Sequence, residues 1–161
     1  MEELRPSPRA RIYPPSLRRI ELILGFLGGI NCVVVPLFFT FQELSFPFRA
    51  PGDLWPFPAI YFIEILVLGL ATTYFIATNQ GIHPTRWNGL PWISAGILLS
   101  LAIMGIFGFG LFLIPAMLSF LAAGILGDRR QGGNWPTHAM QFFFAAMLQA
   151  VAVYLISILF R

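Results

Sequence analysis

The sequence predicts an all-α integral membrane protein, a bundle of five or four transmembrane helices. Of its 161 residues, 57% are hydrophobic and only 11% are charged, whereas soluble domains carry about 25% charged residues. So little polar surface cannot cover a water-soluble globule. Several uncharged stretches reach the ~20 residues that a helix needs to cross a membrane. We therefore expect a single bundle over residues 20–161, with the lipid bilayer as partner and no nucleic-acid binding.

Residues 1–19 form a basic, proline-rich arm that precedes the first apolar stretch. The arm holds half of the ten basic residues of the chain, all of them arginines, together with four prolines. Because proline disfavours helix, we expect the arm to be extended or irregular. The apolar stretch 20–41 is too long for the core of a signal peptide. The arm is thus predicted to stay attached, with its arginine cluster on anionic lipid headgroups.

Two helices are predicted in the first half of the bundle, over residues 20–41 and 59–78. The first contains Gly25 and Gly29, a G-x-x-x-G pair that lets another backbone approach closely. We expect this pair to pack within the chain rather than in a dimer. Between the two helices, residues 42–58 mix prolines with aromatic side chains, which is typical of a loop at the membrane surface.

Residues 91–127 contain no charged side chain and are too long for one span. As one helix they would measure about 55 Å, against a hydrocarbon core of ~30 Å. Three glycines between positions 105 and 110 mark the best place for a break. We therefore predict a hairpin of two short helices, 91–105 and 109–127. A re-entrant hairpin and a single long helix are the alternatives.

The distribution of arginine predicts the orientation. With five helices, the five arginines of the arm lie on the same side as Arg86, Arg129 and Arg130, and two arginines lie opposite. With four helices the division becomes seven to three. Because cytoplasmic loops are enriched in Lys and Arg, the count favours five helices, a cytoplasmic N-terminus and an external C-terminus. The predicted location is a prokaryotic inner membrane or a plasma membrane.

Glu64 is the first candidate for a functional residue. It lies about five residues into the second helix, where a carboxylate costs a few kcal/mol or more in lipid. It should be protonated, paired or turned to a wet cavity. Tyr61 lies one turn earlier on the same face, and Asn31 of the first helix is a candidate partner. A proton or ligand site is the functional interpretation. A carboxylate that reaches the headgroups is the structural one.

The last helix, predicted over residues 136–160 after a polar loop at 128–137, carries a polar stripe. At 100° per residue, the small and polar side chains share one face: His138, Gln141, Ala145, Gln149 and Ala152. Bulky side chains occupy the opposite face: Phe143, Phe144, Met147 and Val151. We expect the stripe to face protein and its Gln side chains to hydrogen-bond to another helix. A water-lined or ligand-lined path is the alternative.

His83 and His138 are the only histidines. Both are predicted at the cytoplasmic boundary, where they could ligate a metal, a haem or a chlorophyll magnesium. They fit ordinary interfacial residues equally well, because no carboxylate or Cys stands at ligand spacing. No paired acid–base or nucleophile motif is readable. The sequence thus predicts no catalytic activity, no metal and no cofactor.

The expected function is that of a non-catalytic accessory or assembly subunit of a larger membrane complex, bound to other membrane subunits. Two features favour it: few side chains in the predicted helices can carry out chemistry, and the 17 phenylalanines supply aromatic faces for a partner. A binder or carrier of a small apolar molecule (a lipid, a quinone or a tetrapyrrole) is the first alternative, with Glu64, Asn31, Gln141 and Gln149 lining its cavity. A proton-coupled transporter that uses Glu64 is the second, and no inverted repeat supports it.

Overall fold

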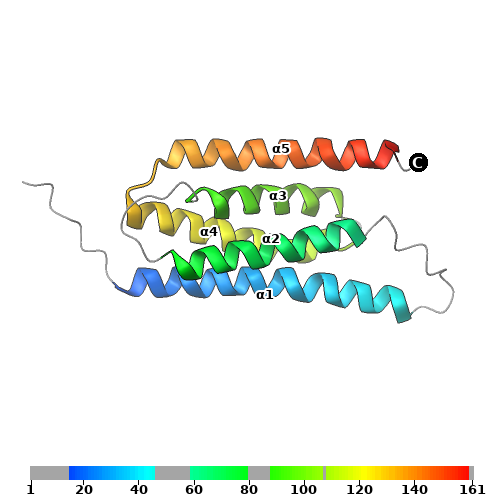
Figure 1. Ribbon diagram of the computed structural model, residues 1–161, viewed down its shortest axis with the longest axis horizontal. Helices are drawn as coiled ribbons and strands as arrows, with labels where there is room; N and C mark the ends of the chain where they lie inside the picture. Colours follow the sequence, from blue (N-terminus) through cyan, green and yellow to red (C-terminus); the bar gives the residue numbers. More distant parts are fainter. Residues whose placement is uncertain (1–14, 46–58, 80–87, 107, 160–161) are drawn as a thin grey trace, which may run out of the picture.

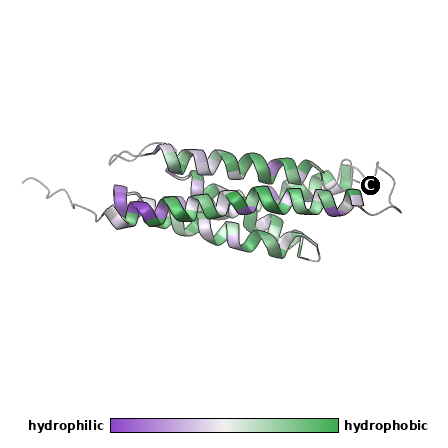
Figure 2. Ribbon diagram, turned by 90° about the horizontal axis from the view of Figure 1, so that it is seen from below, coloured by the Kyte–Doolittle hydropathy of each residue, from purple (hydrophilic) through white to green (hydrophobic). Residues whose placement is uncertain are grey.

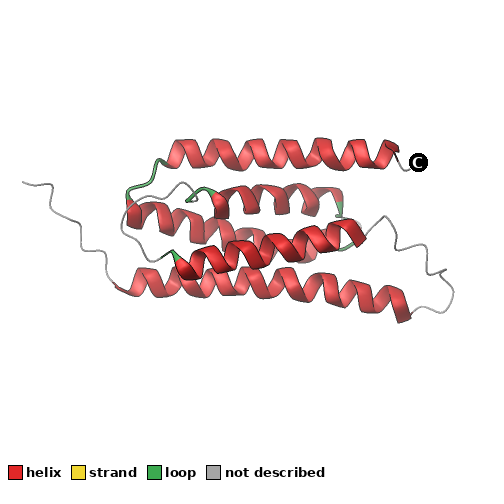
Figure 3. Cartoon of the chain, viewed as in Figure 1, coloured by secondary structure: helices red, strands yellow, loops and turns green. Residues whose placement is uncertain are grey.

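The computed structural model shows a bundle of long helices that run side by side (Figure 1). It describes residues 15–45, 59–79, 88–106 and 108–159. Within these ranges the only regular secondary structure is helical (Figure 3). The predicted all-α fold is therefore confirmed.

Five α-helices and one short 3-10 helix make up the described chain. In order they are α1 (Pro15–Ser45), α2 (Ala59–Thr78), α3 (Leu90–Met104), η2 (Gly110–Leu113), α4 (Ile114–Gln131) and α5 (Trp135–Leu159). The helix α2 has the bounds that the sequence predicted. The chain enters α1 at one end of the bundle and leaves α5 at the other (Figure 1), as an odd number of antiparallel helices requires.

Four segments of the described chain are long and apolar enough to cross a membrane: α1, α2, η2 with α4, and α5. The helix α3 is also apolar but has only 15 residues. At ~1.5 Å per residue it spans about 22 Å, which is short of a hydrocarbon core of ~30 Å. Hydrophobic residues make up most of the length of the helices (Figure 2). The bundle therefore suits a lipid environment.

The predicted hairpin within residues 91–127 is present, since α3 and α4 run antiparallel and are joined by a tight turn. The Gly105 N–H donates to the carbonyl oxygen of Leu101, and the Gly110 N–H donates to that of Gly105, both at 2.8 Å. A Cβ atom at Gly110 would collide with the carbonyl oxygens of Ala102 and Gly105. Glycine is thus required where the two backbones meet, which explains why the uncharged stretch breaks there.

Helix packing divides the bundle into two groups that share α4. The helix α1 packs on α2 and α4, whereas α3 packs on α4 and α5. Glycines permit the close approach of α1, because Cβ atoms at Gly25 and Gly29 would contact Ile76 and Thr73 of α2. The Thr73 hydroxyl also donates to the Gly25 carbonyl at 3.1 Å. The predicted packing of this glycine pair within the chain is confirmed.

The bounds of α1 correct two predictions. The arm was expected to be irregular as far as residue 19, but α1 begins at Pro15. Proline fits the first position of a helix, where its missing N–H costs nothing. The helix also continues beyond residue 41 to Ser45, whose hydroxyl donates to the Phe41 carbonyl at 2.7 Å. The predictions for residues 1–14 and 46–58 lie outside the described residues.

The predicted polar loop at 128–137 is wrong for most of its length. The helix α4 continues to Gln131, and α5 already begins at Trp135. Two arginines in the last turn of α4 favour this extension, because cations stabilise the carbonyl end of a helix. Gly132 then ends α4 in the left-handed region, at φ 67°, which glycine adopts without a steric cost.

Candidate functional site

A buried ion cluster joins three helices at the end of the bundle where α1 begins. Glu21 of α1 is 5% exposed, and two arginines donate to it. The Arg18 Nη1 lies 2.8 Å from Glu21 Oε1, and the Arg130 Nε of α4 lies 3.0 Å from Glu21 Oε2. Arg130 Nη2 is a further donor to Oε1 at 3.4 Å. Two guanidinium groups thus share one carboxylate.

The same arginines bind the carbonyl end of α2. Arg18 Nη2 donates to the carbonyl oxygens of Ile76 at 2.6 Å and Ala77 at 3.3 Å. Arg130 Nη2 donates to that of Asn79 at 3.2 Å. Exposed carbonyls at a helix C-terminus carry a partial negative charge, so these contacts are favourable. The cluster therefore ties α1, α2 and α4 together.

Sequence reasoning missed this cluster. It placed Arg18 in an irregular arm and Arg130 in a loop, and it did not weigh Glu21 at all. The available signal was Glu21 itself, a single carboxylate one position into the first apolar stretch with arginines at positions 18 and 19. A carboxylate one turn after an arginine on a helix predicts an ion pair.

A second polar pair lies where α4 meets α5. His138 Nδ1 lies 2.8 Å from both carboxylate oxygens of Asp128, and Asp128 is 4% exposed. The His138 ring lies 6.5 Å from that of Trp92, centroid to centroid, and Trp92 lies 6.4 Å from Trp135 in an edge-on contact. Asp128 therefore positions His138 against the start of α3.

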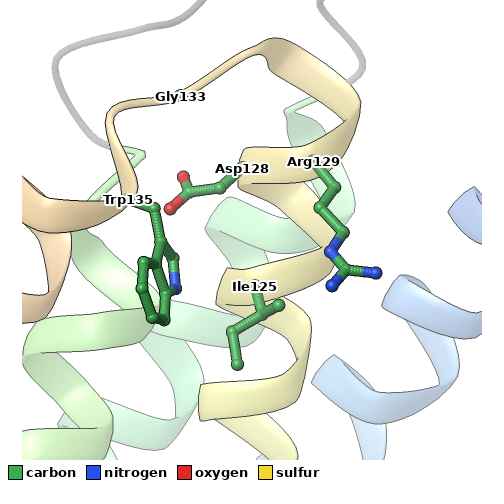
Figure 4. Close-up of a pocket in the computed structure, with 5 residues that line it drawn as sticks. All are labelled: Ile125, Asp128, Arg129, Gly133 and Trp135. Carbon is green, nitrogen blue, oxygen red and sulfur yellow. The ribbon is translucent and has the colours of Figure 1, made fainter.

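A cavity of about 460 Å³ opens beside this pair. Figure 4 shows Trp135 on one side of it and Arg129 on the other, with the Asp128 carboxylate directed toward the tryptophan. Its lining consists of Ile125, Asp128, Arg129, Gly133 and Trp135.

Of the two suggested metal or pigment ligands, His83 lies outside the described residues, and His138 lies in the first turn of α5. His138 has one carboxylate partner that the sequence interpretation did not find. Among the described residues there is no group of three or more His, Cys, Asp or Glu side chains placed to hold a metal ion.

Glu64 is engaged, but not by the partner that the sequence suggested. Gln149 Nε2 of α5 donates to Glu64 Oε2 at 2.9 Å. Asn31 does not take this role, and its Oδ1 is buried without a hydrogen bond to any described residue. Although α1 packs on α2, the Glu64 side chain is directed toward α5. Tyr61 lies one turn away and is buried.

The polar stripe of α5 faces protein, as expected. Phe142 and Ala145 are the buried residues of this helix, and the bulky opposite face is between 52% and 70% exposed at Phe143, Phe144, Met147 and Val151. Beside the stripe lies a cavity of about 250 Å³. Its walls come from α3 and α5: Ile93, Ile97, Gln141, Phe144, Ala145, Leu148 and Gln149.

The polar atoms at this cavity are few. Gln141 Oε1 is buried and accepts no hydrogen bond from the described residues, while Gln149 is held by Glu64. The Gln141 Oε1 packs against Gly89. A mostly apolar lining with few polar groups is typical of sites that bind small apolar molecules.

Comparison with protein families, with curated proteins and with solved structures finds no match to this chain.

Proposed function

We propose that this protein is a non-catalytic accessory or assembly subunit of a larger membrane complex, and that it docks through α5. The observation that carries the proposal is how little of α5 is covered. Only 11% of the most apolar segment of α5 is buried inside the bundle. In the other three long spans, the buried share of the corresponding segment is 33% to 39%. A membrane helix of another protein, packed beside α5, would cover part of this exposed surface.

The exposed face of α5 suits such a partner. Its side chains are large and apolar, with two phenylalanines and two methionines: Met140, Phe143, Phe144 and Met147. Association of helices in lipid depends on van der Waals packing, and methionine adapts to irregular partner surfaces and contacts aromatic rings favourably. We therefore expect this face to bind a helix by shape rather than by charge.

The test compares two exposed apolar faces of the same chain. The double variant Phe143→Ala and Met147→Ala truncates the face of α5. Its control, Val34→Ala and Phe38→Ala, truncates a face of α1 that is 54% to 58% exposed. Each protein is purified from native membranes in mild detergent and its native mass is measured. We expect the partner to be lost only from the α5 variant. A wild-type protein that migrates alone at monomer size refutes the proposal.

A second candidate function is the binding of a small apolar molecule in the cavity between α3 and α5. The observation that favours it is the lining of the cavity, which is apolar except for the side chains of Gln141 and Gln149. A ligand with an apolar body and one polar group would suit this lining. Lipids, reduced quinones and tetrapyrroles include such molecules.

Mass spectrometry of the native protein tests this second function. We expect a retained small molecule in the wild type and its loss in Gln141→Leu, which keeps the size of the side chain and removes its polar atoms. Absence of any retained molecule, together with unchanged stability after lipids and quinones are added, would count against ligand binding.

We further propose that the end of the bundle with the ion cluster faces the cytoplasm of a prokaryotic inner membrane or a plasma membrane. The positive-inside rule supports this orientation, because Arg18 and Arg19 lie near the start of α1 and Arg129 and Arg130 lie in the last turn of α4. In a Cys32→Ser background, an impermeant thiol reagent in intact cells should label Leu159→Cys but not Asn134→Cys. The reverse labelling would invert the topology.

A further inference from the structure

Arginines outnumber carboxylates at the end of the bundle that holds the ion cluster. The described residues of α1 and α4 there include four arginines and two carboxylates: Arg18, Arg19, Arg129, Arg130, Glu21 and Asp128. Arg18 and Arg130 share Glu21, whereas Arg19 and Arg129 are exposed. The carbonyl end of α2 contributes only the partial charge of a helix terminus, about half a charge. This end of α1 and α4 therefore favours an anionic ligand.

A cavity beside the cluster gives such an anion a defined place. It measures about 430 Å³ and is lined by Arg18, Leu22, Ala77 and Arg130. The guanidinium groups are partly accessible, since the side chains of Arg18 and Arg130 are 20% and 11% exposed. The cavity thus combines two cations with an apolar wall from Leu22.

Arg18 retains hydrogen-bond donors for a ligand. A guanidinium has five N–H groups, and the described partners of Arg18 take one from Nη1 and two from Nη2. Its Nε–H and the second N–H of Nη1 find no acceptor among the described residues. Arginine binds phosphate oxygens through pairs of such groups. Because Leu22 follows Arg18 by one turn of α1 toward the interior of the bundle, an acyl chain can continue from a phosphate held there.

We propose that this cavity binds the phosphate of an anionic phospholipid. The headgroup phosphate lies against Arg18 and Arg130, and the first acyl carbons lie on Leu22. A phospholipid with net negative charge is favoured over a zwitterionic one, because the latter brings its own ammonium group to an end of the bundle where arginines outnumber carboxylates. This inference does not depend on the proposed docking of α5, and it would still hold if no partner binds α5.

The experiment measures retention of lipid by the full-length protein in detergent, using native mass spectrometry. The probes are phosphatidylglycerol, phosphatidylcholine and inorganic phosphate. We expect phosphatidylglycerol to bind about tenfold or more tightly than phosphatidylcholine, and inorganic phosphate not to displace it. Equal retention of the two lipids overturns the proposal. Displacement by millimolar inorganic phosphate overturns the assignment of a lipid.

Two pairs of variants separate the cavity from general surface charge. Ala77→Leu narrows the cavity and keeps every charge, whereas Ala71→Leu makes the same change at an exposed position of α2. Arg18→Gln removes a cation from the cavity, and Arg19→Gln removes one from the neighbouring exposed position. We expect about a tenfold loss of phosphatidylglycerol in the first member of each pair only. Equal losses within either pair would show diffuse attraction and refute the site. Thermal unfolding without lipid identifies a variant that merely misfolds.

Discussion

The ion cluster makes a quantitative prediction for Glu21→Gln. The substitution keeps the shape of the side chain but leaves Arg18 and Arg130 facing a neutral amide. Removing one partner of a buried ion pair costs about 3–5 kcal/mol. Glu21 itself is 5% exposed, while the two arginine side chains are 20% and 11% exposed and retain some contact with water. We therefore expect the lower end of the range, about 3 kcal/mol.

The assay is reversible unfolding in mixed micelles, with the free energy of unfolding compared between variants. Glu64→Gln is the matched control, because it makes the same chemical change where the partner is the neutral amide of Gln149. A side-chain hydrogen bond between membrane helices is worth about 0.6 kcal/mol on average, so the control should lose no more than about 1 kcal/mol. Equal losses of unfolding free energy in the two variants would refute the prediction, because they would mean that the two arginines do not depend on the Glu21 carboxylate.

Two further predictions concern close packing and the pair between α4 and α5. Gly28→Ala places a Cβ atom 2.7 Å from the Phe120 ring and should destabilise by about 1–3 kcal/mol. Gly127→Ala places a Cβ atom 3.7 Å from Glu21 Oε1, an ordinary van der Waals contact. This variant should leave the unfolding free energy unchanged or raise it by up to about 1 kcal/mol. His138→Ala leaves the buried Asp128 carboxylate without its partner and should cost about 1–3 kcal/mol. The double variant His138→Ala with Asp128→Leu should recover part of that loss, because it also removes the buried carboxylate. If the double variant is less stable than His138→Ala alone, Asp128 and His138 do not act as a pair.

The spans were predictable from the sequence because lipid imposes a simple length rule. Residues 59–78 and the break near Gly105 follow from hydropathy and from the positions of glycine. The ends of the helices were harder. Residues 42–45 and 128–131 are mostly polar, and polar residues can continue a helix beyond its apolar part. The change from apolar to polar residues therefore predicted where the apolar part of each helix ends, and not where the helix itself ends.

The candidate site was predictable as single residues but not as pairs. Glu64 and Gln149 were each selected from the sequence, since polar side chains in apolar helices are costly and need partners. Their pairing depends on α2 and α5 lying near each other although they are not consecutive helices, which no local pattern encodes. The same reason explains the pairing of Glu21 with Arg130, which joins α1 and α4. Asp128 and His138 lie on consecutive helices, and their pairing was missed because Asp128 was placed in a loop.

The polar contacts of α5 bear on its proposed docking role. This helix is tied to α4 through His138 and Asp128, and to α2 through Gln149 and Glu64. The two ties lie 11 residues apart along α5, which corresponds to about 16 Å. Two fixed points on one face prevent the helix from rotating about its axis. Phe143 and Met147 are consequently held outward, so that a partner helix would meet a preorganised surface. Breaking both ties should weaken partner binding even though neither tie touches the exposed face.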